Sequence, residues 1–219
     1  MSKKKTLLTI LAVMLVCCIA VTGTLAVLFA KTSEPVVNTF TAAGDGKLVT
    51  GDFTLKEHIA AKQNDGSYTL TDALTNNTVK GNDYYVLPRT DLPKDPFITI
   101  TGKTNAPAYL YVEVVDGLPS GMHYAMADCW TKLEGVTGNN GGVVYVYNGG
   151  TNVGTPIDDK SEGLNKISII KNDTITVDDE PGLAKDQTVS LSFYAYLAQA
   201  SVGTPEVAFN TCFGTQGAA

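Results

Sequence analysis

The residues that most often carry out catalysis or bind metals are few in this sequence. Its two histidines are His58 and His123, and neither has a second histidine four positions away. Zinc proteases place such a pair on one helix with a glutamate between them. Two distant histidines and a carboxylate can still converge in a fold, but we expect ordinary surface histidines. Because the Gly-x-Ser-x-Gly pattern of serine hydrolases is also missing, the sequence predicts no enzymatic activity, no metal site and no cofactor.

The cysteines leave two alternatives open. Cys17 and Cys18 lie in an apolar run near the N-terminus, and the other two of the four are Cys129 and Cys212. Outside the cell, Cys129 and Cys212 could form a disulfide. Two buried, unpaired thiols fit the same sequence.

Acidic turns and tyrosines are the remaining candidates for ligand binding. The turns around Asp158–Glu162 and Asp178–Glu180 lack the spaced oxygen ligands and the glycine of an EF-hand calcium loop, so we expect solvated turns. Four tyrosines could form an aromatic face for a glycan, although tyrosines on the outer face of a strand are common: Tyr84, Tyr85, Tyr145 and Tyr147.

The N-terminus has the three parts of a secretory signal peptide. Three lysines at positions 3 to 5 precede an apolar run from Leu7 to Val21, and small residues follow up to Ala26. This pattern predicts cleavage between Ala26 and Val27 and an exported mature chain. The alternative is an uncleaved anchor, because the 24 residues from Leu7 to Ala30 would span about 36 Å as a helix.

Removal of residues 1–26 makes an acidic chain more acidic. The three lysines that are lost lower Lys plus Arg from 16 to 13, against 22 Asp plus Glu, which gives a net charge of −9. Nucleic acids and anionic lipids are bound through clustered Lys and Arg. We therefore expect no nucleic-acid partner and only a transient contact with the membrane, through the signal peptide.

The mature chain is patterned for short strands. Apolar and polar residues alternate in Phe97–Thr101, Ala108–Val115 and Val189–Ala198, which is typical of strands with one face in a core and one in water. On this pattern we expect seven side chains to face solvent: Tyr109, Tyr111, Glu113, Ser190, Ser192, Tyr194 and Tyr196.

Further elements are less regular. Phe53–Glu57 is a strand candidate that could run into a helical turn over His58–Lys62, and Lys166–Ile170 and Thr174–Val177 are predicted to form a hairpin. Thr204 is placed to cap a short helix that begins at Pro205, with Phe209 and Phe213 on one face. Short strands without a long crossover helix predict an all-β, antiparallel sandwich.

Two stretches resemble a known family. Gly23–Ala26, Phe29 and Val37–Thr41 are similar to the junction between signal peptide and mature chain in the TasA/camelysin family, whose members are exported Gram-positive proteins processed by a SipW-type signal peptidase. Leu87-Pro88, Lys94–Pro96 and Thr104–Leu110 resemble the central hairpin of that family. The chain departs from the family at Val27-Leu28, and at Arg89, where a glycine is usual.

The resemblance implies a jelly-roll sandwich with short helical decorations and a structural role in the extracellular biofilm matrix. We expect a signal peptide at 1–26, a mature N-terminal segment at 27–43, and one β-sandwich domain at 44–219. Within the N-terminal segment, one strand is placed to pair with a second copy in a fibre: Val36, Val37, Asn38, Thr39, Phe40 and Thr41. The alternatives are a monomeric binding module that uses the tyrosine-bearing face, secreted or held by an uncleaved anchor, and a camelysin-like metallopeptidase.

Overall fold

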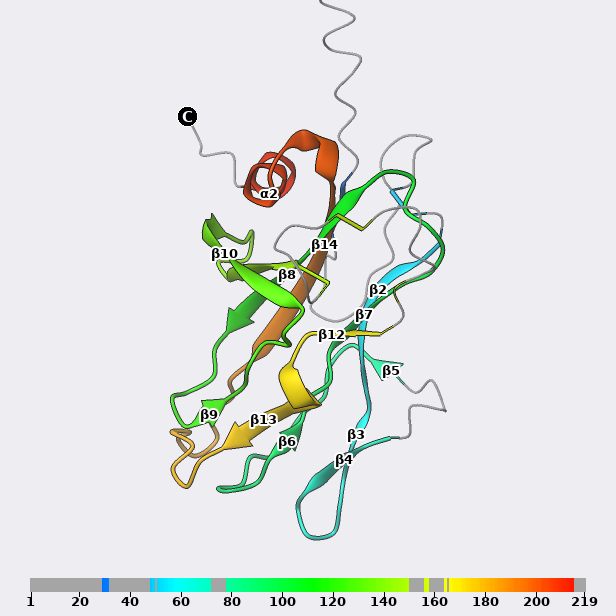
Figure 1. Ribbon diagram of the computed structural model, residues 1–219. Helices are drawn as coiled ribbons and strands as arrows, with labels where there is room; N and C mark the ends of the chain where they lie inside the picture. Colours follow the sequence, from blue (N-terminus) through cyan, green and yellow to red (C-terminus); the bar gives the residue numbers. More distant parts are fainter. Residues whose placement is uncertain are drawn as a thin grey trace, which may run out of the picture.

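The computed structural model describes residues 29–31, 48–49, 51–71, 78–149, 156–157, 164 and 166–214. Strands in several sheets account for most of the regular structure, with one α-helix in this part of the chain (Figure 1). The strand pairs between named elements are antiparallel. The all-β prediction is therefore confirmed.

A five-stranded sheet forms the centre of the molecule. Its order is β1 (Phe29–Lys31), β14 (Leu191–Gln199), β8 (Ala108–Asp116), β11 (Val143–Tyr147) and β10 (Trp130–Thr137). β14 and β8 pair along their full nine-residue lengths, and they run side by side through the middle of Figure 1. Both strands coincide with stretches where the sequence alternates most clearly.

Three smaller sheets make up the rest of the strand structure in the described residues. A four-stranded sheet has the order β12 (Ile167–Ser168), β7 (Phe97–Ile100), β2 (Phe53–His58) and β5 (Thr78–Val79). A three-stranded sheet has the order β6 (Leu92–Pro93), β13 (Thr174–Val177) and β9 (Met122–His123). β3 (Ala60–Lys62) and β4 (Tyr68–Leu70) form a separate hairpin.

The four-stranded and five-stranded sheets share a buried apolar core. Phe53 and Leu55 of β2 and Ile98 of β7 belong to the same cluster as Val112 of β8 and Phe193 of β14. Each of these side chains is at most 1% exposed. The two sheets therefore pack against one another through side chains that alternate along their strands.

The opposite face of the five-stranded sheet is covered by helix α2 (Pro205–Phe213). Tyr111 and Tyr196 are 0% exposed, and their rings lie 5.2 and 5.4 Å from that of Phe209. The predicted helix start is confirmed, because the Thr204 side chain accepts a hydrogen bond from Val207 N. None of the helices described is long and apolar enough to cross a membrane.

This packing corrects the prediction that the face of β8 and β14 that α2 covers points to solvent. Tyr109, Tyr111, Glu113 and Tyr196 are all buried, while Tyr194 is half-buried. A polar tip on an apolar ring suits a covered face as well as a wet one. Alternation alone therefore did not distinguish the two cases.

Two local predictions are wrong. His58–Lys62 does not form a helical turn, because β2 continues to His58 and β3 begins at Ala60. The hairpin predicted across residues 166–177 does not form either, since β12 pairs with β7 whereas β13 pairs with β6 and β9. Between β12 and β13, the 3₁₀ turn Lys171–Asp173 contains Asn172 at φ 60° and directs the chain into a different sheet.

Arg89, which stands where the resembling family usually has glycine, adopts a backbone conformation that is typical of glycine. Arg89 has φ 59°, in the left-handed region that favours glycine. Its guanidinium forms an ion pair with the carboxylate of Asp179, and its backbone N donates to the carbonyl of Asp178. The turn thus keeps a glycine-like backbone although arginine occupies the position.

Candidate functional site

The outer edge of β14 is the first candidate site, because β1 covers only part of it. Phe29–Lys31 pairs antiparallel with residues Tyr196–Ala198. Within the described residues, the stretch Leu191–Tyr194 has β8 as its only strand partner. Backbone N–H and C=O groups along such an edge can pair with a further strand.

β1 lies very close to the predicted processing point. Ala26, Val27 and the predicted assembly strand Val36–Thr41 lie outside the described residues, so their predicted roles stay predictions. Phe29–Lys31 begins two residues after Val27, and sequence reasoning did not identify it as a strand. Three residues, Phe-Ala-Lys, are too few to show an alternating pattern, and they follow directly on the apolar stretch at the predicted cleavage point.

The two mature cysteines are free thiols in separate places. Cys129 packs against the core between the two larger sheets, whereas Cys212 packs against the cluster beneath α2. These clusters lie on opposite faces of the five-stranded sheet, because alternating residues of β8 belong to one or the other. The structure therefore does not pair them. Burial raises the pKa of the Cys129 thiol, and it raises the pKa of Cys212 to about 11.

A buried polar cluster sits at the end of β2. The side chains of Glu57 and Lys94 are 0% and 8% exposed, and Lys94 Nζ lies 2.6 Å from Glu57 Oε2. Glu57 Oε1 accepts a hydrogen bond from Asn82 Nδ2 at 2.8 Å. The Asn82 amide is itself fixed, since Nδ2 also donates to the His58 carbonyl and Oδ1 accepts from Ala60 N, both at 2.8 Å. One carboxylate thus holds an amine on one oxygen and an amide on the other.

His58 lies beside this cluster and is buried, which corrects the expectation of a surface histidine. Its Nδ1 is 2.5 Å from Asp95 Oδ2, and its backbone N donates to Asp95 Oδ1 at 3.0 Å. Lys166 Nζ approaches the same carboxylate at 3.8 Å. Burial, followed by the nearby Asp95, raises the pKa of Asp173. His58 and Asp95 therefore act as a structural pair that satisfies buried polar groups.

Glu113 forms a third polar centre, at the β10–β11 turn. Its carboxylate is 0% exposed and accepts from the backbone N–H groups of Asn140 and Gly142 at 2.7 and 2.9 Å. The Asn140 amide and the Tyr196 hydroxyl donate to it at 2.9 and 2.5 Å. Burial, aided by this bond to Glu113, raises the pKa of Tyr196. A carboxylate with four donors is fully used in holding the turn.

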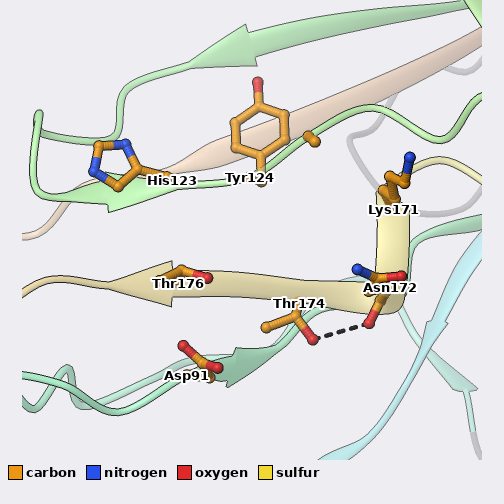
Figure 2. A pocket seen from close by; sticks show the side chains of 8 residues that line it. Asp91, His123, Tyr124, Lys171, Asn172, Thr174 and Thr176 are labelled. Atoms are coloured by element: carbon orange, nitrogen blue, oxygen red, sulfur yellow. Dashed lines mark hydrogen bonds between the residues drawn. The ribbon is translucent and has the colours of Figure 1, made fainter.

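A pocket of about 520 Å³ is lined by residues of β13, by residues 123–125 at and after the end of β9, and by Asp91 and Lys171. Figure 2 shows His123 and Asp91 on either side of β13, with Lys171 at the far end of that strand. His123 is half-exposed, as predicted for a surface histidine, and its Nε2 lies 2.9 Å from Asp178 Oδ2. The polar groups in Figure 2 do not converge on one point, so the pocket lacks the geometry of a reactive centre.

In the described part of the chain, no group of three or more His, Cys, Asp and Glu side chains is placed to hold a metal ion. Sequence reasoning did not find the Glu57–Lys94–Asn82 cluster. The one available signal was the pair of polar residues Glu57-His58, which interrupts the alternation at the end of a strand.

Comparisons with models of protein families, with curated proteins and with solved structures give no match to this chain.

Proposed function

We propose that this protein is an exported structural subunit that assembles into extracellular fibres through its N-terminal segment. The observation that carries the proposal is β1, a strand just after the predicted cleavage point that pairs with the edge of the central sheet. The signal-peptide pattern and the resemblance of the two sequence stretches to the TasA/camelysin family support it. The finer fold that accompanies this proposal is a jelly-roll sandwich with short helical decorations.

The edge of β14 has room for more than β1. Because β1 is opposite Tyr196–Ala198, a second segment could extend the same row along Leu191–Tyr194. The predicted strand Val36–Thr41 of a neighbouring copy has the alternation and length for this role. Pairing with a neighbour would extend the central sheet from one subunit into the next.

The energies show that this strand needs help from other contacts. Six residues could form about five backbone hydrogen bonds at ~1 kcal/mol each. Burial of Val36 and Phe40 would add roughly 1.5 to 3 kcal/mol apiece. That total is comparable to the 4 to 15 kcal/mol that association costs. A fibre must therefore bury additional surface between neighbouring domains.

The binding-module alternative depends on the tyrosines named for an aromatic face: Tyr84, Tyr85, Tyr145 and Tyr147. Tyr85 is 73% exposed, whereas the other three are half-buried. No feature of the described residues favours a particular ligand for these tyrosines.

The test compares the mature chain, Val27–Ala219, with a chain that lacks residues 27–43. Negative-stain microscopy and light scattering should show fibres for the first and monomers for the second, with circular dichroism confirming that both are folded. Thr39→Pro should block fibres because proline removes a backbone donor, whereas Thr39→Val should preserve them. Fibres of equal length from Thr39→Pro would overturn the role of the predicted strand.

The anchor alternative has its own test. An intact mass that begins at Val27 for the protein recovered outside the cell would support cleavage and exclude an uncleaved anchor. A mass that retains residues 1–26 would overturn the predicted processing.

A further inference from the structure

We propose that Lys94 and Asn82 condense into an intramolecular amide cross-link, with Glu57 as the proton-transfer group. The bond would join the segment after β5 to the segment after β6. This inference does not depend on the proposed assembly, because it concerns groups within one folded chain.

The arrangement of the three side chains carries the inference. Glu57 contacts both reaction partners at once: Oε2 lies 2.6 Å from Lys94 Nζ, and Oε1 accepts from Asn82 Nδ2 at 2.8 Å. The carboxylate is fully buried and the amine nearly so. The two oxygens of one carboxylate therefore hold the amine and the amide, and holding two reactants in place is what makes intramolecular reactions fast.

The neighbouring groups leave Glu57 as the carboxylate available to Lys94. Asp95 is engaged by His58 and faces Lys166, and the backbone N of Lys94 is anchored to the Asp173 carbonyl at 2.8 Å. Tyr84 borders the cluster, where its hydroxyl donates to the Pro93 carbonyl. Burial and the charges of Glu57 and Asp95 raise the pKa of Tyr84, so this neighbour stays neutral.

The chemistry needs no external reagent. Glu57 accepts a proton from the Lys94 ammonium, and the neutral amine attacks Asn82 Cγ. The Ala60 N–H, 2.8 Å from Asn82 Oδ1, stabilises the negative charge that develops on that oxygen. Glu57 then passes that proton to Nδ2 of Asn82, the Cγ–Nδ2 bond breaks, and ammonia leaves. The Lys94 nitrogen gives up its second proton, through Glu57, to the departing ammonia. One C–N bond forms, one breaks, and one ammonium ion is released while Glu57 returns to a carboxylate.

The polarity of the hydrogen bonds agrees with each step. The leaving nitrogen already faces the carboxylate that would protonate it, and the carbonyl oxygen already faces a backbone donor. General acid–base catalysis requires these groups within hydrogen-bond reach of the atoms they protonate or deprotonate. The same geometry without reaction would be a buried ion pair beside a structural asparagine, and mass spectrometry separates the two.

The experiment is intact-mass measurement on protein purified from the full chain. We expect a mass lower than the sequence mass of the recovered chain by one ammonia. Trypsin should yield peptide 81–89 joined to peptide 90–103, with no cleavage after Lys94. Lys94→Arg, Asn82→Ser and Glu57→Gln should each have the full mass calculated from the sequence of that variant. Lys56 is a neighbouring residue on β2, and Lys56→Arg should keep the cross-link.

Several outcomes would overturn the proposal. A folded protein with the full sequence mass and linear peptides shows that the cluster is only structural. Loss of ammonia that persists in Lys94→Arg assigns the loss to cyclisation of Asn82 with its own backbone. If Glu57→Gln fails to fold by circular dichroism, Asn82→Ser provides the comparison, since it removes the electrophile and leaves the Glu57–Lys94 pair in place.

Discussion

At the scale of single residues, the buried carboxylate of Glu113 has the clearest energetic role. Its two oxygens accept from four donors, so a neutral isostere would turn an NH₂ group toward other N–H groups. We expect Glu113→Gln to lower the free energy of unfolding by about 2 to 4 kcal/mol, because a buried donor left without an acceptor is costly. Urea denaturation measures this change.

The control for Glu113 is Glu134→Gln on β10. Glu134 forms an exposed ion pair with Lys132, and such pairs contribute little. Equal stability of the two variants would contradict the assigned role of Glu113.

The two thiols give a second prediction at this scale. Burial raises the pKa of Cys212 from 9.0 to about 11 and that of Cys129 in the same direction. Both should stay protonated at neutral pH and react slowly with iodoacetamide until the protein unfolds, because the thiolate is the nucleophile. Intact mass after alkylation counts the modified thiols. A chain that resists alkylation even when unfolded without reductant would instead contain a disulfide.

The raised pKa of Cys212 also makes the stability of the protein depend on pH. A thiol whose pKa is higher in the folded state favours folding below pH 9, and this contribution is lost as the pH rises toward about 11. Cys212→Ala should therefore show a weaker loss of stability over that pH range than the unmodified chain. Denaturation midpoints measured at pH 8 and at pH 11 test the difference.

At the scale of elements, α2 and the face that it covers form one packing unit. Phe209 is 0% exposed and contacts the rings of Tyr111 and Tyr196. Phe209→Ala should cost about 3 to 5 kcal/mol of stability, the usual range for emptying an aromatic core position. Val207→Ala, at a 48% exposed position of the same helix, should cost less than about 0.5 kcal/mol. Urea denaturation compares them, and a similar loss for both would show that α2 is not docked.

The turn at Arg89 offers a prediction of stabilisation. Its left-handed backbone suits glycine, while its ion pair with Asp179 is exposed on both sides and contributes little. Arg89→Gly should therefore leave stability unchanged or raise it by up to about 1 kcal/mol. Arg89→Ala keeps the strain and loses the ion pair, so it should be the less stable variant in thermal denaturation.

The sequence predicted the elements that are determined by residues close together in the chain. Alternation identified β7, β8 and β14, and the Thr204-Pro205 pair identified the start of α2. The failures share a different cause: the covering of Tyr111 by α2, the burial of His58 by Asp95, and the redirection of the chain at Asn172 depend on partners distant in sequence. The cluster of Glu57, Lys94 and Asn82 was not predicted for the same reason. It forms only where β2, the segment after β5 and the segment after β6 meet.

At the scale of the whole molecule, the question is whether the β14 edge accepts a strand from outside. A chain that lacks residues 27–43 has lost β1, so its edge should bind a synthetic peptide of residues 27–41. A chain that retains its own β1 should bind the peptide at least about tenfold more weakly, a difference of about 1.4 kcal/mol, because part of the edge is already paired. Fluorescence anisotropy of the labelled peptide measures both affinities.

Two peptide variants then locate the paired segment. Ala30→Pro should weaken binding if the β1 residues of the peptide occupy the edge, and Thr39→Pro should weaken it if the predicted assembly strand does. Proline acts in each case by removing a backbone donor from the sheet. Equal binding to both chains, or no binding to either, would show that the edge of β14 is not the site of assembly. The contacts between subunits would then lie elsewhere on the molecule.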